Sequence, residues 1–557
     1  MFIKVTPRKK GDKTYYYAEL VEAYREDGKV KHKRILYFGS VDQDIVQKLK
    51  VVFSQDFDSF TNINKVDFSA AVPYGNFFLI DAICQQLGMF NSFKSCFVSL
   101  DSHITVNTAV NYIKAMIFQR IIQPDSKLAL TEWLPLTPLN HFIDHGYELD
   151  LQTIYRSLDV LKENFHVVEK YLYHWATENY NQKSSELFYD ITSSYFEGHK
   201  CIIAEYGYSR DKRGDKEQIV IGLVTTSDGF PIKCNIYPGN KPDKTTVSEV
   251  INELKRDFPI EEVVFVGDRG MITADNITAI EELKQKYVMA IPRAWSKKYL
   301  KKIAIDENTM RKIKDDLYAI FIPPVDNHRF LLCLNICKRE DDRQYRNHCL
   351  DVIKEEIFKL NSSLGKNKNI KTRDEAMKRV GSISKLNKAG KYFEVKTVDS
   401  TNNTLGFELE YEIKSDKLED DERLDGTFLI QTNNDDYEDE KLIKIYKNLS
   451  KVENAFRIIK NDLDIRPIYH RKVDRVKGHV YICVIAYFIF TAIEYISKDT
   501  KLNKSARKIL RQLSRINLLE ISLPNGKRKY SLTMIDKEQK KLLNIYNIKK
   551  LEVPDVV

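Results

Sequence analysis

The chain has 557 residues, of which 43% are hydrophobic and 30% charged, with 21 glycines and 15 prolines. This length predicts several structural units, and the composition is that of a globular chain, which excludes collagen-like, low-complexity and wholly disordered proteins. The formal net charge of +9 is concentrated at the ends: residues 501–550 carry fourteen bases and three acids, and residues 1–40 carry ten and five. Basic ends suggest a polyanionic partner, although a solvated helix face would also explain the C-terminal run.

Eight cysteines are too few for a disulfide framework at this length and predict reduced thiols in a cytosol. Cys333 and Cys337 have no second Cys or His pair at zinc-finger spacing nearby, so we expect no structural zinc site there. The N-terminal MFIKVTPRKKGDK has no apolar stretch after its basic residues, so no secretory signal is expected.

The N-terminal part of the chain predicts a β-hairpin followed by helices. Two strand-like runs between Tyr15 and Phe38 lie on either side of Glu26-Asp27-Gly28, which is a turn signal. Residues 72–180 show helical periodicity that three prolines interrupt: Pro124, Pro135 and Pro138.

From about residue 186 the pattern changes to short runs rich in Val, Ile, Tyr and Phe. The runs ELFYDIT, QIVIGLVTT and PIKCNIYPG predict three strands, TTVSEVINELKRD a helix, and EEVVFVGD a fourth strand. The apolar run Val263 to Val266 shows no alternation, which is typical of a strand covered on both faces. A helix from Ala274 to Lys286 and a strand from Tyr287 to Pro292 follow.

Residues 294–424 break this rhythm and predict an inserted α+β domain. It contains the strand-like runs FLLCLNIC, KYFEVKTV and TLGFELEYEI and ends in SDKLEDDER, which we interpret as a polar linker. The α/β pattern resumes with GTFLIQTN and a long helix from about Glu438 to Asn461. Val480 to Ile493 is too short for a membrane span and predicts a buried core helix.

These patterns divide the chain into six parts: an N-terminal basic hairpin unit (1–66), a helical, DNA-binding domain (67–182), the first part of a catalytic domain (183–293), an insertion (294–424), the second part of the catalytic domain (425–497) and a basic C-terminal region (498–557).

Three carboxylates stand where desolvation is costly unless a ligand offsets it. Asp190 follows the apolar run LFY, Asp268 follows VVFVG, and Glu453 lies on the long helix. A divalent cation is one common way to offset that cost. For each aspartate alone, a helix cap or a turn acid is the simpler interpretation.

The long helix carries two stripes. Ile445, Leu449, Val452, Phe456, Ile459 and Leu463 recur at spacings of 4, 3, 4, 3 and 4, which predicts the face buried in the core. Tyr446, Glu453, Arg457 and Lys460 form a second stripe one residue further round. Surface pairing between Glu453 and Arg457 would explain that stripe equally well without a site.

The residues resemble bacterial insertion-sequence transposases of the DDE type, the group with the signature Y-x2-R-x3-E-x6-K. The signature segment reads YKNLSKVENAFRIIK, in which Tyr446, Glu453 and Lys460 match and Leu449 stands in place of the Arg. The helical pattern explains this departure, since position 449 belongs to the apolar stripe. The resemblance spans roughly residues 15–495 and includes LFYDITSSYFEG, YGYSRDKRGDKEQIVIGLVTTSDGFPIKCNIYPGN, VVFVGDRGMIT and IRPIYHRKVDRVKGHV.

The resemblance implies a ribonuclease H-like mixed sheet flanked by helices, which agrees with the strand order expected above. It further implies that Asp190, Asp268 and Glu453 are the catalytic acids and hold two Mg²⁺ ions, for which Mn²⁺ can substitute, with Asp190 bridging both. Such a pair serves in-line phosphodiester cleavage. Water attacks first and frees a 3′-OH at the element end, which then attacks target DNA.

The same resemblance implies that Lys460, Tyr446, Arg457 and Arg269 contact DNA phosphates. The expected partner is double-stranded DNA, both element ends and target, bound by a homodimer in a synaptic complex. The expected location is the cytoplasm, on the nucleoid. Two alternatives stay open: a ribonuclease H-like nuclease without strand transfer, and a DNA-binding protein that no longer cleaves.

Overall fold

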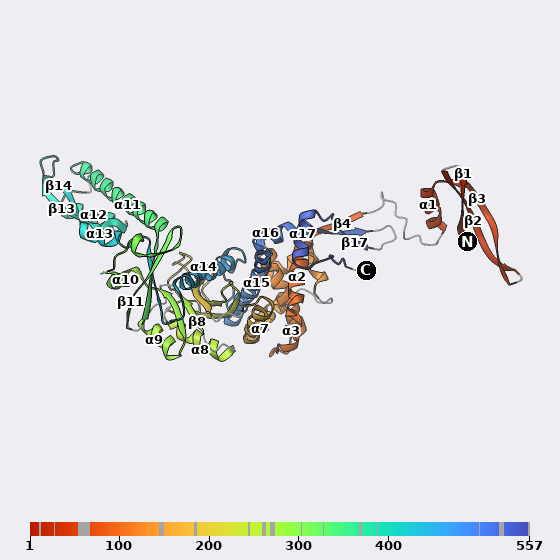
Figure 1. Ribbon diagram of the computed structural model, residues 1–557, viewed down its shortest axis with the longest axis horizontal. Coiled ribbons are helices and arrows are strands. Elements are labelled where there is room, and N and C mark those ends of the chain that lie inside the picture. The colour runs from red at the N-terminus through yellow and green to blue at the C-terminus, as the bar shows by residue number, and fades with distance from the viewer. Residues whose placement is uncertain are drawn as a thin grey trace. The chain divides into compact units, whose positions relative to one another are not determined.

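The structure is a computed structural model that describes residues 1–10, 13–26, 28–53, 67–143, 150–182, 186–242, 245–258, 263–267, 273–301, 303–326, 328–366, 370–386, 388–500, 502–522 and 528–554. The chain divides into two compact units. The first comprises residues 1–81, 133–142 and 507–557, and the second comprises residues 82–132 and 143–506. Figure 1 shows the elements, which make a mixed α/β protein.

The predicted N-terminal hairpin is confirmed and belongs to a three-stranded antiparallel sheet in the first unit. Strand β2 (Lys13–Glu26) is the central strand between β1 (Phe2–Lys10) and β3 (Lys29–Val41). The hairpin closes with Glu26 opposite Lys29. Helix α1 (Gln43–Phe53) packs on this sheet, and Ile3, Ala18 and Leu20 form its small core.

A second three-stranded sheet of the first unit joins two distant segments of the chain. Its order is β17 (Arg528–Leu532), β16 (Asn517–Ser522) and β4 (Asp67–Pro73). The helices α16 (Ala506–Leu513) and α17 (Lys537–Ile545) come from the same C-terminal segment. Helix α2 (Gly75–Gln86) begins against it so closely that a Cβ at Gly75 would lie 2.6 Å from the Leu513 carbonyl oxygen.

The second unit contains the remaining helices of the predicted helical region. They are α3 (Met89–Cys96), α4 (Val106–Ile122), α5 (Lys127–Trp133), α6 (Leu151–Glu163) and α7 (Phe165–Asn179). Helix α15 (Val473–Asp499) packs against α4 and α6. By length and composition it is the one described helix that could cross a membrane, but 78% of its apolar window is buried inside the protein. It therefore has the environment of the buried core helix expected from Val480 to Ile493.

A nine-stranded mixed sheet forms the centre of the second unit. Its order is β10 (Arg311–Lys314), β11 (Leu317–Val325), β12 (His328–Asn335), β15 (Thr427–Thr432), β9 (Lys286–Ala290), β8 (Val264–Gly267), β5 (Glu186–Tyr195), β6 (Gln218–Thr225) and β7 (Pro231–Pro238). Strand β8 pairs in parallel with both β5 and β9, and the other neighbours are antiparallel. All the strands expected between residues 186 and 292 are present.

Two helix layers cover this sheet. Helices α8 (Val247–Asp257) and α9 (Ala274–Glu282) lie on one face, where Val250, Ile251 and Ile280 join a core with Leu187, Tyr189 and Phe265. Helix α14 (Asp439–Asn461) contacts β5, β6, β8 and β9, and Figure 1 shows it on the opposite side of these strands from α8 and α9. Strand β8 is buried throughout, as its continuous apolar run predicts.

The segment predicted as an insertion contributes both to this sheet and to a separate core. Its strands β10, β11 and β12 extend the central sheet. Helices α11 (Ile336–Ser363) and α12 (Arg373–Leu386) pack with a two-stranded sheet of β13 (Phe393–Asp399) and β14 (Phe407–Ile413) around a second core. Helix α10 (Arg293–Leu300) precedes β10.

Two sequence predictions of local structure are wrong. The segment SDKLEDDER is helix α13 (Ser415–Glu422) instead of a linker, and it is held at Asp421, which is buried. Helix α9 ends at Glu282 and does not reach Lys286, because Lys284 adopts a positive φ of 54° that ends the helical path. Tertiary contacts of Asp421 outweigh the polar composition in the first case, and the backbone conformation at Lys284 ends the helix in the second.

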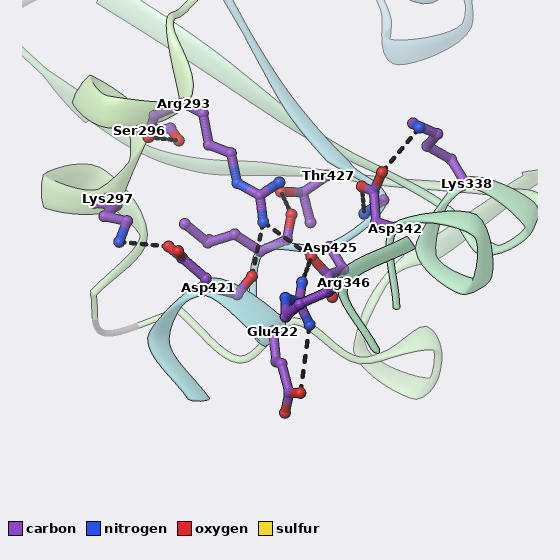
Figure 2. A network of polar contacts seen from close by, with 12 residues as sticks. Arg293, Ser296, Lys297, Lys338, Asp342, Arg346, Asp421, Glu422, Asp425 and Thr427 are labelled. Carbon is purple, nitrogen blue, oxygen red and sulfur yellow. Dashed lines mark hydrogen bonds and ion pairs between the residues drawn. The ribbon is translucent and has the colours of Figure 1, made fainter. Parts of the chain in front are cut away.

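A buried ionic network holds the base of α11 and α13 to α10 (Figure 2). Asp425 has a fully buried side chain and accepts from Arg346, which is 7% exposed, and from Arg293 at 3.0 Å. Burial raises the pKa of Asp421, but hydrogen bonds from Lys297, Lys391 and Tyr392 outweigh that effect and hold the pKa below its usual range. The network thus fixes where the second core leaves the central sheet.

Candidate active site

Asp190 lies in the middle of β5, the central strand between β8 and β6. Its neighbours Tyr189 and Ile191 belong to the core under α8 and α9. Because successive side chains of a strand point to opposite faces, the Asp190 side chain points to the face that α14 covers. It is half-buried, and its Oδ1 accepts a hydrogen bond of 2.8 Å from the Ile191 backbone N–H.

Glu453 lies on α14, whose buried face is the one the sequence predicts. Leu449 is 5% exposed and Val452 and Leu463 are fully buried, so the position of the signature Arg is a core position in this chain. Glu453 itself is on the exposed side of the helix. Helix α14 thus lies on the face of the sheet to which Asp190 points, and Glu453 projects from the side of that helix away from its buried stripe.

Asp268 and Arg269 lie outside the described residues. Strand β8 ends at Gly267, one position before Asp268 in the chain. It pairs in parallel with β5, with Val266 opposite Phe188. The strand that bears Asp190 and the strand that leads to Asp268 are therefore direct neighbours with the same direction.

Helix α14 is anchored along its length. Near its start, Lys441 Nζ lies 3.9 Å from Glu186 Oε1 at the beginning of β5. In its middle, Lys451 donates to Asp228 at 2.8 Å in the turn between β6 and β7. After its end, buried Arg120 of α4 donates to the backbone oxygens of Leu463 and Asp464. These contacts tie the start, the middle and the segment after α14 to three different elements of the second unit.

The other predicted residues of the second stripe have separate partners. Tyr446 stacks on Phe428 of β15, with ring centroids 5.6 Å apart. Arg457 is exposed, and its Nη2 donates to Asn454 Oδ1 at 2.7 Å. Lys460 is 11% exposed and donates to Asp211 Oδ1 at 2.7 Å. The structure therefore places these side chains along one helix without gathering all three at one point.

Asp211 is a residue that the sequence analysis missed. Its side chain is 3% exposed and binds both Lys460 and Arg466, while its buried Oδ2 accepts no hydrogen bond from a described residue. Burial lowers the pKa of Lys460, although the hydrogen bond and charge of Asp211 act in the opposite direction. The sequence offered only its place in SRDKRGD, where acidic and basic residues are mixed and nothing distinguishes Asp211 from the other acid.

The loop that carries Asp211 closes over the end of β5. Arg210 donates its backbone N–H to Ser193 Oγ at 2.9 Å, and Phe196 pairs with Ile468, which follows α14. The ion cluster of Asp211, Lys460 and Arg466 thus joins this loop to both sides of the α14 C-terminus. It stabilises the helix that bears Glu453 against the strand that bears Asp190.

The three predicted acids would suit a hard divalent cation. Asp190 and Glu453 offer carboxylate oxygens, which Mg²⁺ and Mn²⁺ prefer. Within the described part of the chain no three His, Cys, Asp or Glu side chains are gathered into a group that could hold a metal ion. The third predicted ligand, Asp268, is not in that part.

Comparison with known families assigns most of the second unit to a protein family. Residues 181–489 match the family described as Transposase DDE domain, which is more than half of the chain. The chain belongs to the DDE transposase family. Residues 3–55 of the transposase also match the N-terminal domain of IS1634 family transposases, which confirms the resemblance to bacterial insertion-sequence enzymes. Membership implies a metal-dependent enzyme that cleaves DNA.

Other comparisons add little to this assignment. No curated protein matches the transposase sequence. Among solved structures, it is similar to one described as "Cryo-EM structure of piggyBac transposase synaptic complex with hairpin DNA (SNHP)", at 10% identity over 80% of this chain and 82% of that chain. The TM-score is 0.34, which is too low to establish a common fold.

Proposed function

We propose that this transposase binds the terminal inverted repeats of an insertion sequence, cleaves the ends by Mg²⁺-dependent hydrolysis and joins the 3′-OH to target DNA. Asp190, Asp268 and Glu453 would be the catalytic acids. The observation that carries the proposal is that Asp190 points to the sheet face covered by α14, which bears Glu453. The strand leading to Asp268 runs parallel to β5 beside it.

The strand order supports a ribonuclease H-like catalytic domain. Part of the sheet has the order β7-β6-β5-β8-β9. Strands β5, β6 and β7 follow one another in the chain and are antiparallel neighbours, whereas β8 and then β9 pair in parallel on the other side of β5. Helix α8 connects β7 to β8. This is the strand-strand-strand-helix-strand order of that fold, with the first acid on its central strand.

The chain's residues would prepare the site in two ways. Strand β5 holds the Asp190 carboxylate on a rigid element, and the anchors of α14 hold Glu453 on the same face. With Asp268, these acids would hold two Mg²⁺ or Mn²⁺ ions. When bound, such a pair supplies activation of the attacking oxygen and stabilisation of the leaving oxygen.

DNA would be held by cationic and phenolic groups along α14 and after β8. Arg457 is exposed and available to a phosphate, and Lys460 and Tyr446 lie on the same stripe. Arg269, next to Asp268, would act in the same way. These contacts fix the position of the strand without reading its sequence.

The assembly and location follow from the reaction. Two element ends must be held together for joining, so we propose a homodimer on DNA. A protein that acts on bacterial DNA works in the cytoplasm, in association with the nucleoid.

The test replaces each acid by the amide of the same size and shape. Asp190→Asn, Asp268→Asn and Glu453→Gln should each abolish Mg²⁺-dependent nicking of DNA that carries the element ends, while DNA binding stays within a few-fold of the unsubstituted protein. Glu440→Gln is the matched control on α14, because its side chain is 62% exposed and lies in the first turn. Normal cleavage by any of the three variants would remove that residue from the site.

A further inference from the structure

The C-terminal segment carries the most concentrated positive charge of the chain, and the structure arranges it on defined elements. Residues 501–550 contain fourteen bases against three acids. Two of these acids are used within the fold: Glu520 forms a 3.2 Å ion pair with Arg528, and Asp536 caps α17 in a capping box. Within the segment, the bases therefore exceed the acids by eleven (14 − 3).

Helix α16 has buried apolar residues on one side and exposed basic residues on the other. Ala506, Ile509, Leu510 and Leu513 are buried, while Lys508 and Arg511 are exposed on the other side of the helix. Arg515, just after the helix, is also exposed. The helix thus has one apolar face that packs and one basic face that meets the solvent.

A short β-ribbon follows α16 in the chain and also carries exposed basic residues. Strand β16 is the middle strand of its sheet, so β17 forms the edge. Arg528 and Lys529 on β17 are both exposed. The major groove of B-DNA admits an α-helix, and exposed Lys and Arg are the groups that neutralise its phosphates.

We propose that the exposed face of α16, formed by Lys508, Arg511 and Arg515, is a docking surface for double-stranded DNA, distinct from the catalytic acids. The inference rests on the proposed function, because it takes the DNA of the transposition reaction as the occupant. It assigns a DNA-binding element to a region in which the sequence pattern shows charge alone. The three side chains contact phosphates, and the ribbon of β16 and β17 lies along the same duplex.

The test compares two triple variants that remove the same charge from the same segment. The first is Lys508→Gln, Arg511→Gln and Arg515→Gln on the proposed surface. The control is Lys537→Gln, Lys540→Gln and Lys541→Gln on α17, where the three lysines line a separate shallow hollow of ≈ 490 Å³. All six positions are exposed, so neither variant should unfold the chain, and circular dichroism checks this.

Binding to a fluorescein-labelled duplex of generic sequence is measured between about 50 and 200 mM salt, where binding falls steeply as counterions return to the phosphates. Loss of three phosphate contacts should lower the slope of log K against log salt by about 2.7 for the α16 variant. The α17 variant should keep a slope close to that of the unsubstituted protein. Equal slopes for the two variants, or an unchanged slope for the α16 variant, would overturn the inference.

Cleavage of end-containing DNA at low salt separates this inference from the proposed function. The α16 variant should still nick that DNA once bound, because the three acids are intact, whereas Asp190→Asn should bind but not nick. An α16 variant with normal binding beside an inactive Asp190→Asn would refute the docking surface alone. An unsubstituted protein that neither binds nor nicks DNA would refute both.

Discussion

Asp425 offers a direct test of how the second core is held to the central sheet. Its side chain is fully buried, and its carboxylate faces Arg346, which is 7% exposed, and Arg293, which is 41% exposed (Figure 2). In Asp425→Ala, Arg293 can turn to solvent, but Arg346 stays buried, with Glu422 at 3.3 Å as its remaining carboxylate. Removing one partner of a buried ion pair typically costs about 3–5 kcal/mol.

The lower end of that range applies, because Glu422 compensates part of the Arg346 charge. A local loss of about 3 kcal/mol corresponds to roughly a hundredfold faster exchange of amide hydrogens that open with this region. Hydrogen exchange is the appropriate assay, because a chain of several units has no single unfolding free energy. We expect the faster exchange in α11 and α13, and unchanged exchange in β5 and β8.

Asp315→Ala is the control for this prediction. Asp315 is fully exposed and lies 3.6 Å from Lys312, and a solvent-exposed ion pair of this kind contributes little to stability. If Asp425→Ala and Asp315→Ala exchanged alike in α11, the network would not hold the second core. A double variant Asp425→Leu with Arg346→Met should recover most of the protection, because it leaves no buried charge without a partner.

Two further predictions concern the second unit. Lys127 is buried with no hydrogen-bond partner for Nζ among described residues, and burial, with help from Arg120, lowers its pKa to about 7. Between that pKa and the unfolded value of about 10.4, the unfolded state holds one proton more than the folded state. The unfolding free energy of the second unit should therefore rise with pH by up to about 1.4 kcal/mol per pH unit. The thermal transition of this unit should lose that rise in Lys127→Met, and an identical pH dependence in the two proteins would contradict the prediction. Leu449→Arg restores the family signature but places a cation at a position that is 5% exposed, so it should lower the melting temperature. The control Lys447→Arg, on the exposed side of the helix, should not lower it. An unchanged melting temperature for Leu449→Arg would mean that α14 can rotate the residue to solvent.

The sequence alone determined the parts of this protein that depend on local pattern. The turn at Gly28 predicts a hairpin, and the continuous apolar run before Gly267 predicts a strand covered on both faces. The spacing of Leu449, Val452 and Phe456 predicts the buried face of a helix, and the structure has all three elements. The family motifs were also legible, because they are contiguous. The proposed acids Asp190 and Glu453 were identified from such segments.

Only the tertiary structure decided which distant segments meet. Asp211 and Lys460 are 249 positions apart, and β4 pairs with β16 across more than 440 residues. No local period encodes such pairings, because they depend on how buried charges and strand edges find partners after the elements form. The same reason explains α13: SDKLEDDER is polar enough for a linker, but Lys297, Lys391 and Tyr392 give Asp421 the partners that hold it as a helix.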